Sequence, residues 1–339
     1  MRREARRWAV FVLTLLLSLG EVGRAHAYQT YGVSVGEQVV TLKWATLPFR
    51  YYVTDQDAPG VSAAQVRDSV GRAFVTWESV ATAAVSAEFV GFTSAEPGDD
   101  DGQNTLGFRS RPDLDGVLGA TDYLIDDTTG AIIEADTFFN TTYAWSVAPA
   151  GEAGKFDLDS IALHETGHVF GLGHSDLGET ELLAGGGRRV VAAEAVMFPI
   201  AYSAGVIAGR TVRADDIAGL SALYPRGSFL ADSGGISGRV TKDGQGVFGA
   251  HVVAFNPATG ALVGNLSLDT RGSFAIMSLA PGPYILRVEP LDDVDLDSFF
   301  GDADIPLVDL DFRVGYCPQL VIVPRGGFSQ SVEVAVVAK

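Results

Sequence analysis

Cysteine is almost absent from this 339-residue sequence, in which Cys317 is the only one. A single cysteine excludes a disulfide within the chain, so an exported product would lack the cross-links of small secreted domains. We interpret Cys317 as a small, buried apolar residue. Histidine is also scarce, with five residues, so a cluster of histidines is informative.

Basic residues are few as well. The chain has 24 Lys and Arg against 42 Asp and Glu, a formal net charge of −18. This balance argues against nucleic acid or an anionic membrane as a partner. Hydrophobic residues make up 47% of the chain, enough to bury a core, and the length favours two domains. We expect a monomer.

Long hydrophobic runs are missing. The apolar run at residues 8–19 is too short to span a bilayer comfortably, and no other candidate span is present. It follows a basic start at residues 1–7 and precedes Ala25-His26-Ala27, a small-x-small cleavage pattern. These features predict a signal peptide at residues 1–27 and a secreted, extracellular product. Periplasmic or surface retention, or an uncleaved anchor, are the alternatives.

Residues 164–175 hold the strongest pattern in the chain. His164 and His168 are four residues apart, which places both imidazoles on one face of a helix. Gly171 allows a left-handed turn that ends the helix and brings His174 back as a third nitrogen ligand. Three protein ligands with one open position are typical of catalytic zinc. Glu165, next to the first ligand, can act as the catalytic base on a zinc-activated water.

A histidine cluster without a metal is the plainer interpretation of these residues. It is unfavourable, because three buried imidazoles would face one another without compensation for their desolvation. His26 and His251 are the only other histidines, so a second, three-histidine zinc site is excluded. The sequence therefore predicts one catalytic Zn²⁺.

The motif with the downstream methionine Met197 resembles the metzincin pattern, and Ser175 after the third histidine resembles its matrixin branch. The resemblance extends over about residues 42–225. Other matching residues include Phe74, Trp77, Glu134, Asp136, Trp145, Ala195–Pro199, Asp215, Asp216 and Tyr224. It implies a secreted zinc endopeptidase that cleaves internal peptide bonds of proteins, with a Met-turn at Met197. It also implies an α+β domain of one twisted, mixed sheet plus three helices, at residues 28–226.

Further expectations come from the resemblance and from departures from it. An extended substrate would pair with a sheet edge near Leu118, Gly119 and Ala120. The cysteine latch of many matrixins is absent. Pro199 stands two residues after Met197, where related families place a tyrosine. Residues 177–194 are longer than the usual link and contain three consecutive glycines, which predicts a flexible inserted loop near the cleft.

The family's structural metal ligands are also replaced. In the segment that aligns with them, Phe138, Asn140 and Tyr143 occupy the places of a zinc histidine and of calcium carboxylates. A calcium ion could still be held by one of three acidic loops, although a solvated loop is favoured for each. The candidate ligands are Asp99, Asp100, Asp101, Asp113, Asp115, Asp126 and Asp127.

Local patterns predict the elements of this domain. Ser62 and Gln65 form a capping box before a helix whose apolar residues run from Val66 to Trp77. Asp157 or Asp159 caps the helix of the histidine motif. A last helix covers 214–224. The predicted strands are Phe49–Thr54, Ala87–Phe92, Thr105–Phe108, Val117–Ile125 and Ile132–Phe139.

The character of the sequence changes after a linker at residues 227–235. From Ile236 onward, alternating apolar residues and turns predict a small all-β sandwich at 236–339. It resembles the prealbumin-type carboxypeptidase regulatory-like domain, and we expect a noncatalytic accessory module. The acidic stretch from Asp292 to Asp311 is predicted to be a long loop before a last strand at 330–337. His251 is expected to face solvent.

Two further function classes remain open beside the zinc endopeptidase. One is a noncatalytic surface or adhesion protein with an idle metal site, and the other is a zinc hydrolase of a nonpeptide amide. The intact Glu165 argues against the idle site, because such a protein would lose its general base first.

Overall fold

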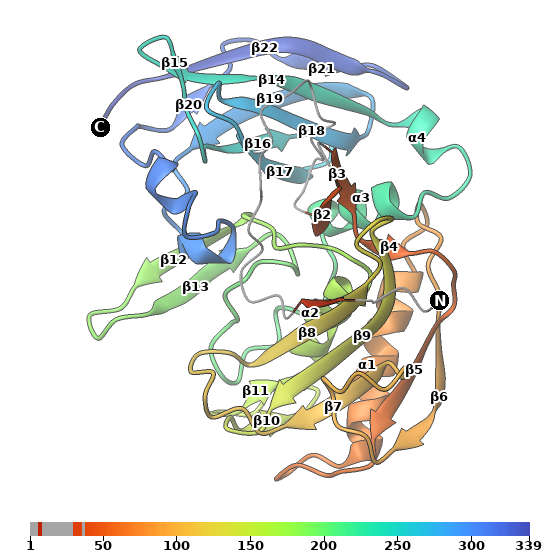
Figure 1. The fold of residues 1–339 in the computed structure, drawn as a ribbon. Coiled ribbons are helices and arrows are strands. Elements are labelled where there is room, and N and C mark those ends of the chain that lie inside the picture. The colour runs from red at the N-terminus through yellow and green to blue at the C-terminus, as the bar shows by residue number, and fades with distance from the viewer. Residues whose placement is uncertain (1–5, 9–29, 36–37) are drawn as a thin grey trace.

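The computed structural model describes residues 6–8, 30–35 and 38–339. Two units lie one above the other in Figure 1: a first unit, residues 42–226, and a second unit, residues 234–339. The predicted signal peptide falls outside the described residues except for the short strand β1 (Arg6–Trp8).

The first unit is built on one mixed sheet. Its strands are β1, β4 (Lys43–Trp44), β5 (Phe49–Thr54), β6 (Ala87–Thr93), β7 (Thr105–Arg109), β8 (Gly119–Ile125) and β9 (Ala131–Asn140). They follow the order β1-β8-β9-β7-β5-β6, and β4 also pairs with β9. The pairs among β5, β6, β7 and β9 are parallel, whereas β8 is antiparallel to β9.

Strand β8 lies near the border of this sheet. Its pairing with β1 involves only Tyr123, Leu124 and Ile125. Within the part of the chain that the structure describes, Gly119 and Ala120 face no further strand on that side. All five predicted strands are present, with ends shifted by one or two residues in four of them.

Three helices belong to the first unit: α1 (Ala63–Glu78), α2 (Leu158–Val169) and α3 (Ala214–Leu223). Ser62 and Gln65 form the predicted capping box of α1, and Asp157 caps α2 by accepting from the Ser160 amide. Helix α1 buries the predicted apolar face, including Phe74 and Trp77, in one core with the sheet and α2. The small pair β10 (Trp145–Ser146) with β11 (Phe156–Asp157) completes the unit. Before it in the chain, β2 (Gly32–Val35) pairs with β3 (Gln38–Thr41).

The predicted inserted loop has regular structure, which corrects that expectation. Residues of the insertion form an antiparallel hairpin of β12 (Gly178–Leu182) and β13 (Arg188–Ala193). Gly186 and Gly187 have positive φ, so the glycines make the turn between the strands. The hairpin extends from the first unit at the left of Figure 1.

The second unit consists of two sheets that share a hydrophobic core. One sheet contains β14 (Gly234–Lys242), β15 (Gln245–Gly246), β18 (Ser273–Leu279) and β22 (Phe328–Val336). The other contains β16 (His251–Phe255), β17 (Leu262–Leu266), β19 (Gly282–Glu289), β20 (Gly315–Tyr316) and β21 (Val321–Val323). Within the predicted linker, α4 (Phe229–Asp232) forms and β14 begins. The predicted acidic loop carries two 3₁₀ turns, η1 (Leu296–Ser298) and η2 (Ile305–Leu307).

The expectation that His251 faces solvent is wrong. Its side chain is 5% exposed and lies 3.1 Å from an Asp176 carboxylate oxygen in the first unit and 3.2 Å from Glu289. Burial alone would lower the pKa of His251, but the two carboxylates outweigh it and raise this pKa to about 10. Strand alternation indicated only which side of the sheet the ring occupies, not that the first unit covers that side.

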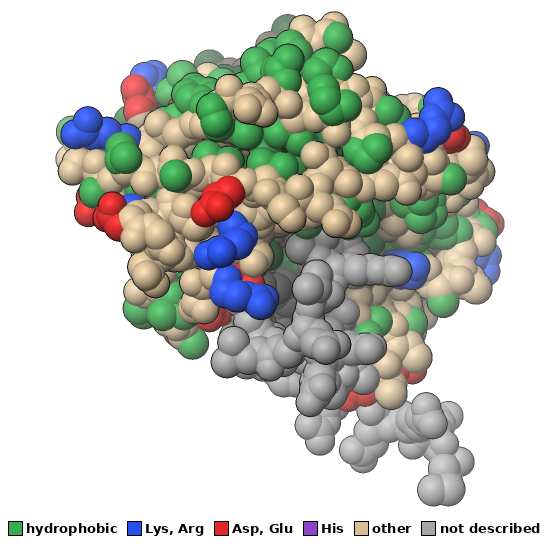
Figure 2. All heavy atoms as spheres, turned by 90° about the horizontal axis from the view of Figure 1, so that it is seen from above, with side chains coloured by type: hydrophobic (Ala, Val, Ile, Leu, Met, Phe, Trp, Pro, Cys, Tyr) green, Lys and Arg blue, Asp and Glu red, His purple; other side chains and the backbone are tan. Residues whose placement is uncertain are grey.

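Another surface of the second unit exposes hydrophobic side chains to solvent. Exposed hydrophobic side chains on β20 to β22 include Tyr316, Ile322 and Phe328. Figure 2 looks down on this end of the molecule and shows hydrophobic side chains gathered over it. None of the helices in the described ranges has the length and apolar character needed to cross a membrane.

Candidate metal centre

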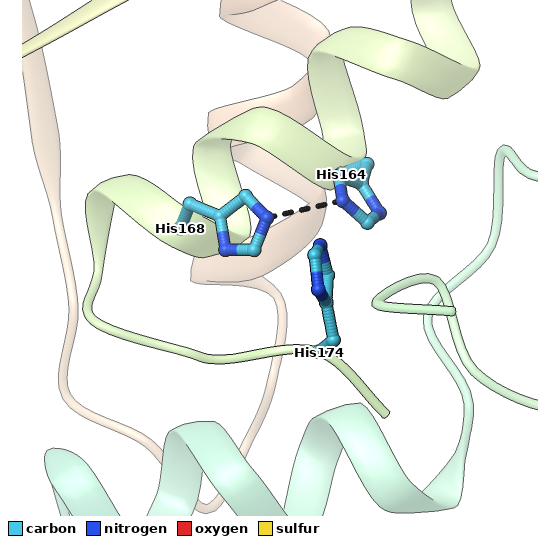
Figure 3. Close-up of side chains that lie close together, drawn as sticks. All are labelled: His164, His168 and His174. Atoms are coloured by element: carbon cyan, nitrogen blue, oxygen red, sulfur yellow. Dashed lines mark hydrogen bonds between the residues drawn. The ribbon is translucent and has the colours of Figure 1, made fainter. Parts of the chain in front are cut away.

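Three histidines converge beside helix α2. His164 and His168 project from one face of the helix, and His174 returns from the loop that follows it (Figure 3). Their candidate ligand nitrogens all lie within 4.8 Å of one another. The Nε2 atoms of His164 and His168 are 3.1 Å apart. Two nitrogens on a tetrahedral zinc are about 3.3 Å apart at ordinary Zn–N lengths, so this spacing suits one ion.

Backbone carbonyls fix the tautomer of each ring. His164 Nδ1 lies 2.7 Å from the Val196 carbonyl oxygen, and His168 Nδ1 lies 2.8 Å from that of Leu172. His174 Nδ1 lies 3.1 Å from the carbonyl oxygen of Ser298. Each Nδ1 must therefore donate its proton, which leaves each Nε2 as a bare lone pair.

This arrangement explains why a cation fits. With Nδ1 protonated on every ring, no Nε2 has a hydrogen to give to its neighbour, so the close Nε2 atoms of His164 and His168 repel one another without a metal. Burial lowers the pKa of all three rings, His164 to about 3, and the other imidazoles contribute for His164 and His168. The rings are therefore neutral at pH 7, as metal ligation requires.

The turn around Met197 holds the backbone carbonyl that orients His164. Asp216, in the first turn of α3, accepts from the amides of Val196 at 2.9 Å and Met197 at 3.1 Å. This holds the Val196 carbonyl against His164, so α3 positions the first ligand through the turn. Burial raises the pKa of Asp216 to about 6, although the amide bonds oppose the shift. The sequence pattern did not assign this role to Asp216.

Gly167 is required by the packing between α2 and Met197. A Cβ at this position would lie 2.4 Å from Met197 Sδ and 2.8 Å from Trp77 Cζ2. We expect Gly167→Ala to destabilise the fold by about 1–3 kcal/mol through overpacking and to weaken metal binding by displacing the turn. Urea unfolding and a zinc titration check this. Gly185→Ala, where a Cβ meets nothing within 4 Å, is the control.

Glu165 lies between the triad and strand β8. It is 4% exposed, and its Oε2 accepts from Thr121 Oγ1 at 3.1 Å. A Cβ built on Gly119 would lie 3.1 Å from Glu165 Oε1. Burial raises the pKa of Glu165 to about 8, with Thr121 opposing and Asp122 adding to the shift. The structure thus brings the predicted base beside the predicted substrate edge at Leu118, Gly119 and Ala120.

Aromatic residues from distant segments contact His168. The ring of Tyr31 lies 5.4 Å from that of His168, and Tyr123 Oη donates to the His168 carbonyl at 2.5 Å. Gly171 has φ +90°, as predicted, and a Cβ there would lie 2.3 Å from the Leu42 carbonyl oxygen. The motif could not reveal Tyr31, because no local pattern ties this residue to the helix.

The acidic loops considered for calcium differ from one another. Asp113 forms an ion pair with Arg111, and Asp126 accepts from the amides of its own turn, so both are engaged locally. Asp100 instead lines a small hollow together with Asp122, Glu134 and Asp136. Phe138, Asn140 and Tyr143 contact the loop that carries Asp113 and Asp115. The Arg111 guanidinium lies over the Phe138 ring, Asn140 bonds to backbone groups of Arg111 and Val117, and Tyr143 Oη accepts from the Gly116 amide.

The fold and the site together define a domain in which a buried carboxylate lies beside three histidines that could hold a metal ion. The family model of matrixins, peptidase family M10, matches residues 43–184 of this chain. The matched range includes the three histidines and Glu165 and ends before Met197. The chain therefore contains a matrixin-like domain, and matrixins are zinc-dependent endopeptidases.

Sequence similarity to a matrix metalloproteinase agrees with this match. Over 139 residues, 40% of this chain, the sequence is 30% identical to matrix metalloproteinase-16 of Rattus norvegicus. The aligned part covers 22% of the length of that relative. The similarity thus concerns one domain, and the second unit lies outside the family match.

Proposed function

We propose that this protein is a zinc-dependent endopeptidase that hydrolyses internal peptide bonds of proteins. The observation that carries the proposal is the geometry of His164, His168 and His174, whose protonated Nδ1 atoms face carbonyls and whose Nε2 atoms converge. These rings would hold the ion. When bound, zinc supplies a Lewis acid that activates water and polarises the scissile carbonyl.

The chain's own residues would do the remaining work. Glu165 accepts a proton from the attacking water and returns it to the leaving amine nitrogen. Its buried position and its bond from Thr121 hold the carboxylate in one place, and its raised pKa suits a group that both takes and gives a proton. Asp216 holds the amides of Val196 and Met197 and so keeps the Val196 carbonyl, and with it His164, in position.

The substrate edge follows from strand β8. Backbone groups at Leu118, Gly119 and Ala120 that do not bond to β9 would pair with an extended peptide, and the missing side chain of Gly119 leaves room beside Glu165. An extended peptide on this edge presents its backbone next to the metal centre, which favours cleavage within a chain rather than at its ends.

Several features of the whole protein belong to this proposal. The N-terminal pattern supports export to the outside of the cell, with the mature enzyme acting as a monomer. Two sheets with a shared core in the second unit support the prealbumin-type, carboxypeptidase regulatory-like assignment. The domain borders proposed are 28–226, 227–235 and 236–339.

Calcium has no support in the geometry of the described carboxylates. Among the described residues, the set of three or more side chains close enough together to hold an ion is His164, His168 and His174. At the hollow of Asp100, Asp122, Glu134 and Asp136, both Asp136 oxygens and one Glu134 oxygen already accept from backbone amides.

Removal of zinc is expected to abolish proteolysis and to lower stability. Zinc at about 100 times its dissociation constant adds about 2.7 kcal/mol to the free energy of unfolding, because it binds only the folded chain. Cleavage of an unfolded protein substrate, followed before chelation, after chelation and after zinc is restored, checks the activity. Thermal unfolding in the same samples checks the stability.

The outcomes separate the candidate functions. Loss and recovery of both activity and stability support a zinc endopeptidase. Recovery of stability without any cleavage would instead indicate an idle metal site.

A further inference from the structure

One of the three backbone carbonyls that orient the histidine rings comes from the second unit. The Val196 and Leu172 carbonyls that orient His164 and His168 belong to the first unit. The carbonyl that accepts from His174 Nδ1 belongs to Ser298, 124 residues further along the chain. Ser298 ends the 3₁₀ turn η1, which lies above the β12–β13 hairpin in Figure 1.

The segment around Ser298, residues 291–301, is anchored by buried aromatic side chains. Phe299 is 4% exposed and its ring lies 6.2 Å from that of His174. Phe300 is fully buried and packs on Phe248 at 5.3 Å. Both belong to an apolar cluster that also includes Phe198, the residue after Met197. One cluster thus joins the second unit to the turn below the metal site.

Polar contacts tie the same segment to the hairpin of the first unit. Asp293 accepts from the Thr180 amide at 2.8 Å, and its carbonyl accepts from the Thr180 hydroxyl at 2.6 Å. Arg188 donates to the Asp292 carbonyl at 2.9 Å and pairs with Asp295 at 3.0 Å. The β12–β13 hairpin of the insertion therefore adds polar contacts that hold residues 291–301, beside the apolar contacts of Phe299 and Phe300.

Buried polar contacts also join the two units near His174. Asp176, two residues after His174, lies against His251 of the second unit, and Asp215 of α3 accepts from the Gly264 amide at 3.0 Å. Leu177 packs with Val253 in a small shared cluster. The chain directly after His174 is thus fixed by the second unit.

We infer that the second unit is part of the metal centre: residues 291–301 act as a positioning element that holds His174 in its ligating tautomer and orientation. This rests on the proposed zinc site, and it replaces the expectation of a separate accessory module. A carbonyl on the second nitrogen of a ligating imidazole sets its tautomer, fixes the ring plane and raises its basicity. Loss of such a partner typically lowers metal affinity about 10- to 100-fold.

The test compares two phenylalanine truncations in the full chain. Phe299→Ala removes the ring that packs beside His174 and loosens the Ser298 carbonyl. Phe312→Ala removes an equally large, fully buried ring from the other core of the second unit, away from the triad. Zinc affinity is measured by competition with a chromophoric chelator, and the geometry of the site by the absorption spectrum of the cobalt(II)-substituted protein.

The expected result is specific to the first variant. Phe299→Ala should bind zinc about 10- to 100-fold more weakly and shift the cobalt spectrum. Phe312→Ala should keep the parent's affinity and spectrum while losing stability. Phe299→Leu should recover most of the affinity, because it refills the space.

A milder variant covers the case in which Phe299→Ala does not fold. Thr180→Val with Arg188→Ala removes the hydroxyl and guanidinium contacts between the hairpin and residues 291–301 without opening a core, while the Thr180 amide bond to Asp293 stays. Zinc affinity should fall in the same direction by a smaller factor. If Phe299→Ala folds and binds zinc as tightly as the parent, the inference is overturned. If Phe299→Ala is unfolded, parental zinc affinity in the double variant overturns it. An equal loss in Phe312→Ala would overturn it as well.

The proposed function fails differently. A parent chain that binds no zinc or cleaves no peptide contradicts the endopeptidase itself. If the parent binds zinc and is active, but Phe299→Ala does not change the zinc affinity, only the role of the second unit is contradicted.

Discussion

Replacing Glu165 by alanine is expected to lower kcat/KM about 10²- to 10⁴-fold while zinc stays bound. The side chain is buried beside the triad, bonded by Thr121, and close to the strand edge where Gly119 leaves space. It is therefore the carboxylate among the described residues that is placed to move protons at the metal centre. None of the contacts that fix the three imidazoles involves its side chain.

Steady-state kinetics on one fluorogenic peptide, with zinc content measured in the same samples, check this prediction. Glu165→Gln keeps the size and loses the base, so it should match the alanine variant. Glu88→Ala, an exposed carboxylate on β6, is the control for removal of a carboxylate elsewhere and should cleave like the parent. Retention of more than about a tenth of parental activity in Glu165→Ala would contradict the role of general base.

Replacing His251 by alanine is expected to lower the free energy of unfolding by about 3–5 kcal/mol, the usual cost of breaking a buried ion pair. The change leaves Asp176, whose side chain is 5% exposed, and Glu289 without the cation between them. The Nε2–Oδ1 approach of 3.1 Å is an ion contact and not a well-aligned hydrogen bond, so the stabilisation comes mainly from charge.

The same ion pair predicts a pH dependence. The folded pKa of His251 is raised to about 10, above its ordinary value of 6.5. A raised pKa means that the stabilisation is fully present below about pH 6.5 and is lost as the pH rises through the folded value. The parent should therefore lose stability between these limits, and His251→Ala should lose less over the same range.

Denaturant unfolding at several pH values measures both effects. Arg325→Ala is the matched control, because its pair with Asp232 is exposed at the surface and should contribute less than about 1 kcal/mol. Equal stabilities of the parent and His251→Ala at pH 6 would show that the buried pair does not hold the two units together.

The local parts of the site could be predicted from the sequence. The spacing of His164 and His168 places two rings on one helical face, and Gly171 adopts the left-handed turn that returns His174. Strands such as β5 were predictable for a similar reason, because their alternation reports burial directly. These features depend on neighbours a few residues apart.

Features that join distant segments could not be predicted. A backbone carbonyl such as that of Ser298 carries no sequence signature, so its bond to His174 is invisible before folding. His251 has the same strand pattern whether water or another unit covers it. The three glycines of the insertion indicated flexibility, but the strands on either side pair and the glycines provide the turn.

The measurement that tests the central claim most directly is cleavage of a diverse peptide library by the zinc-loaded full chain, with products identified by mass spectrometry. We predict cuts at internal peptide bonds that disappear on chelation and return with zinc. A folded, zinc-loaded chain that leaves every peptide intact, or that removes only terminal residues, would contradict the assignment as an endopeptidase.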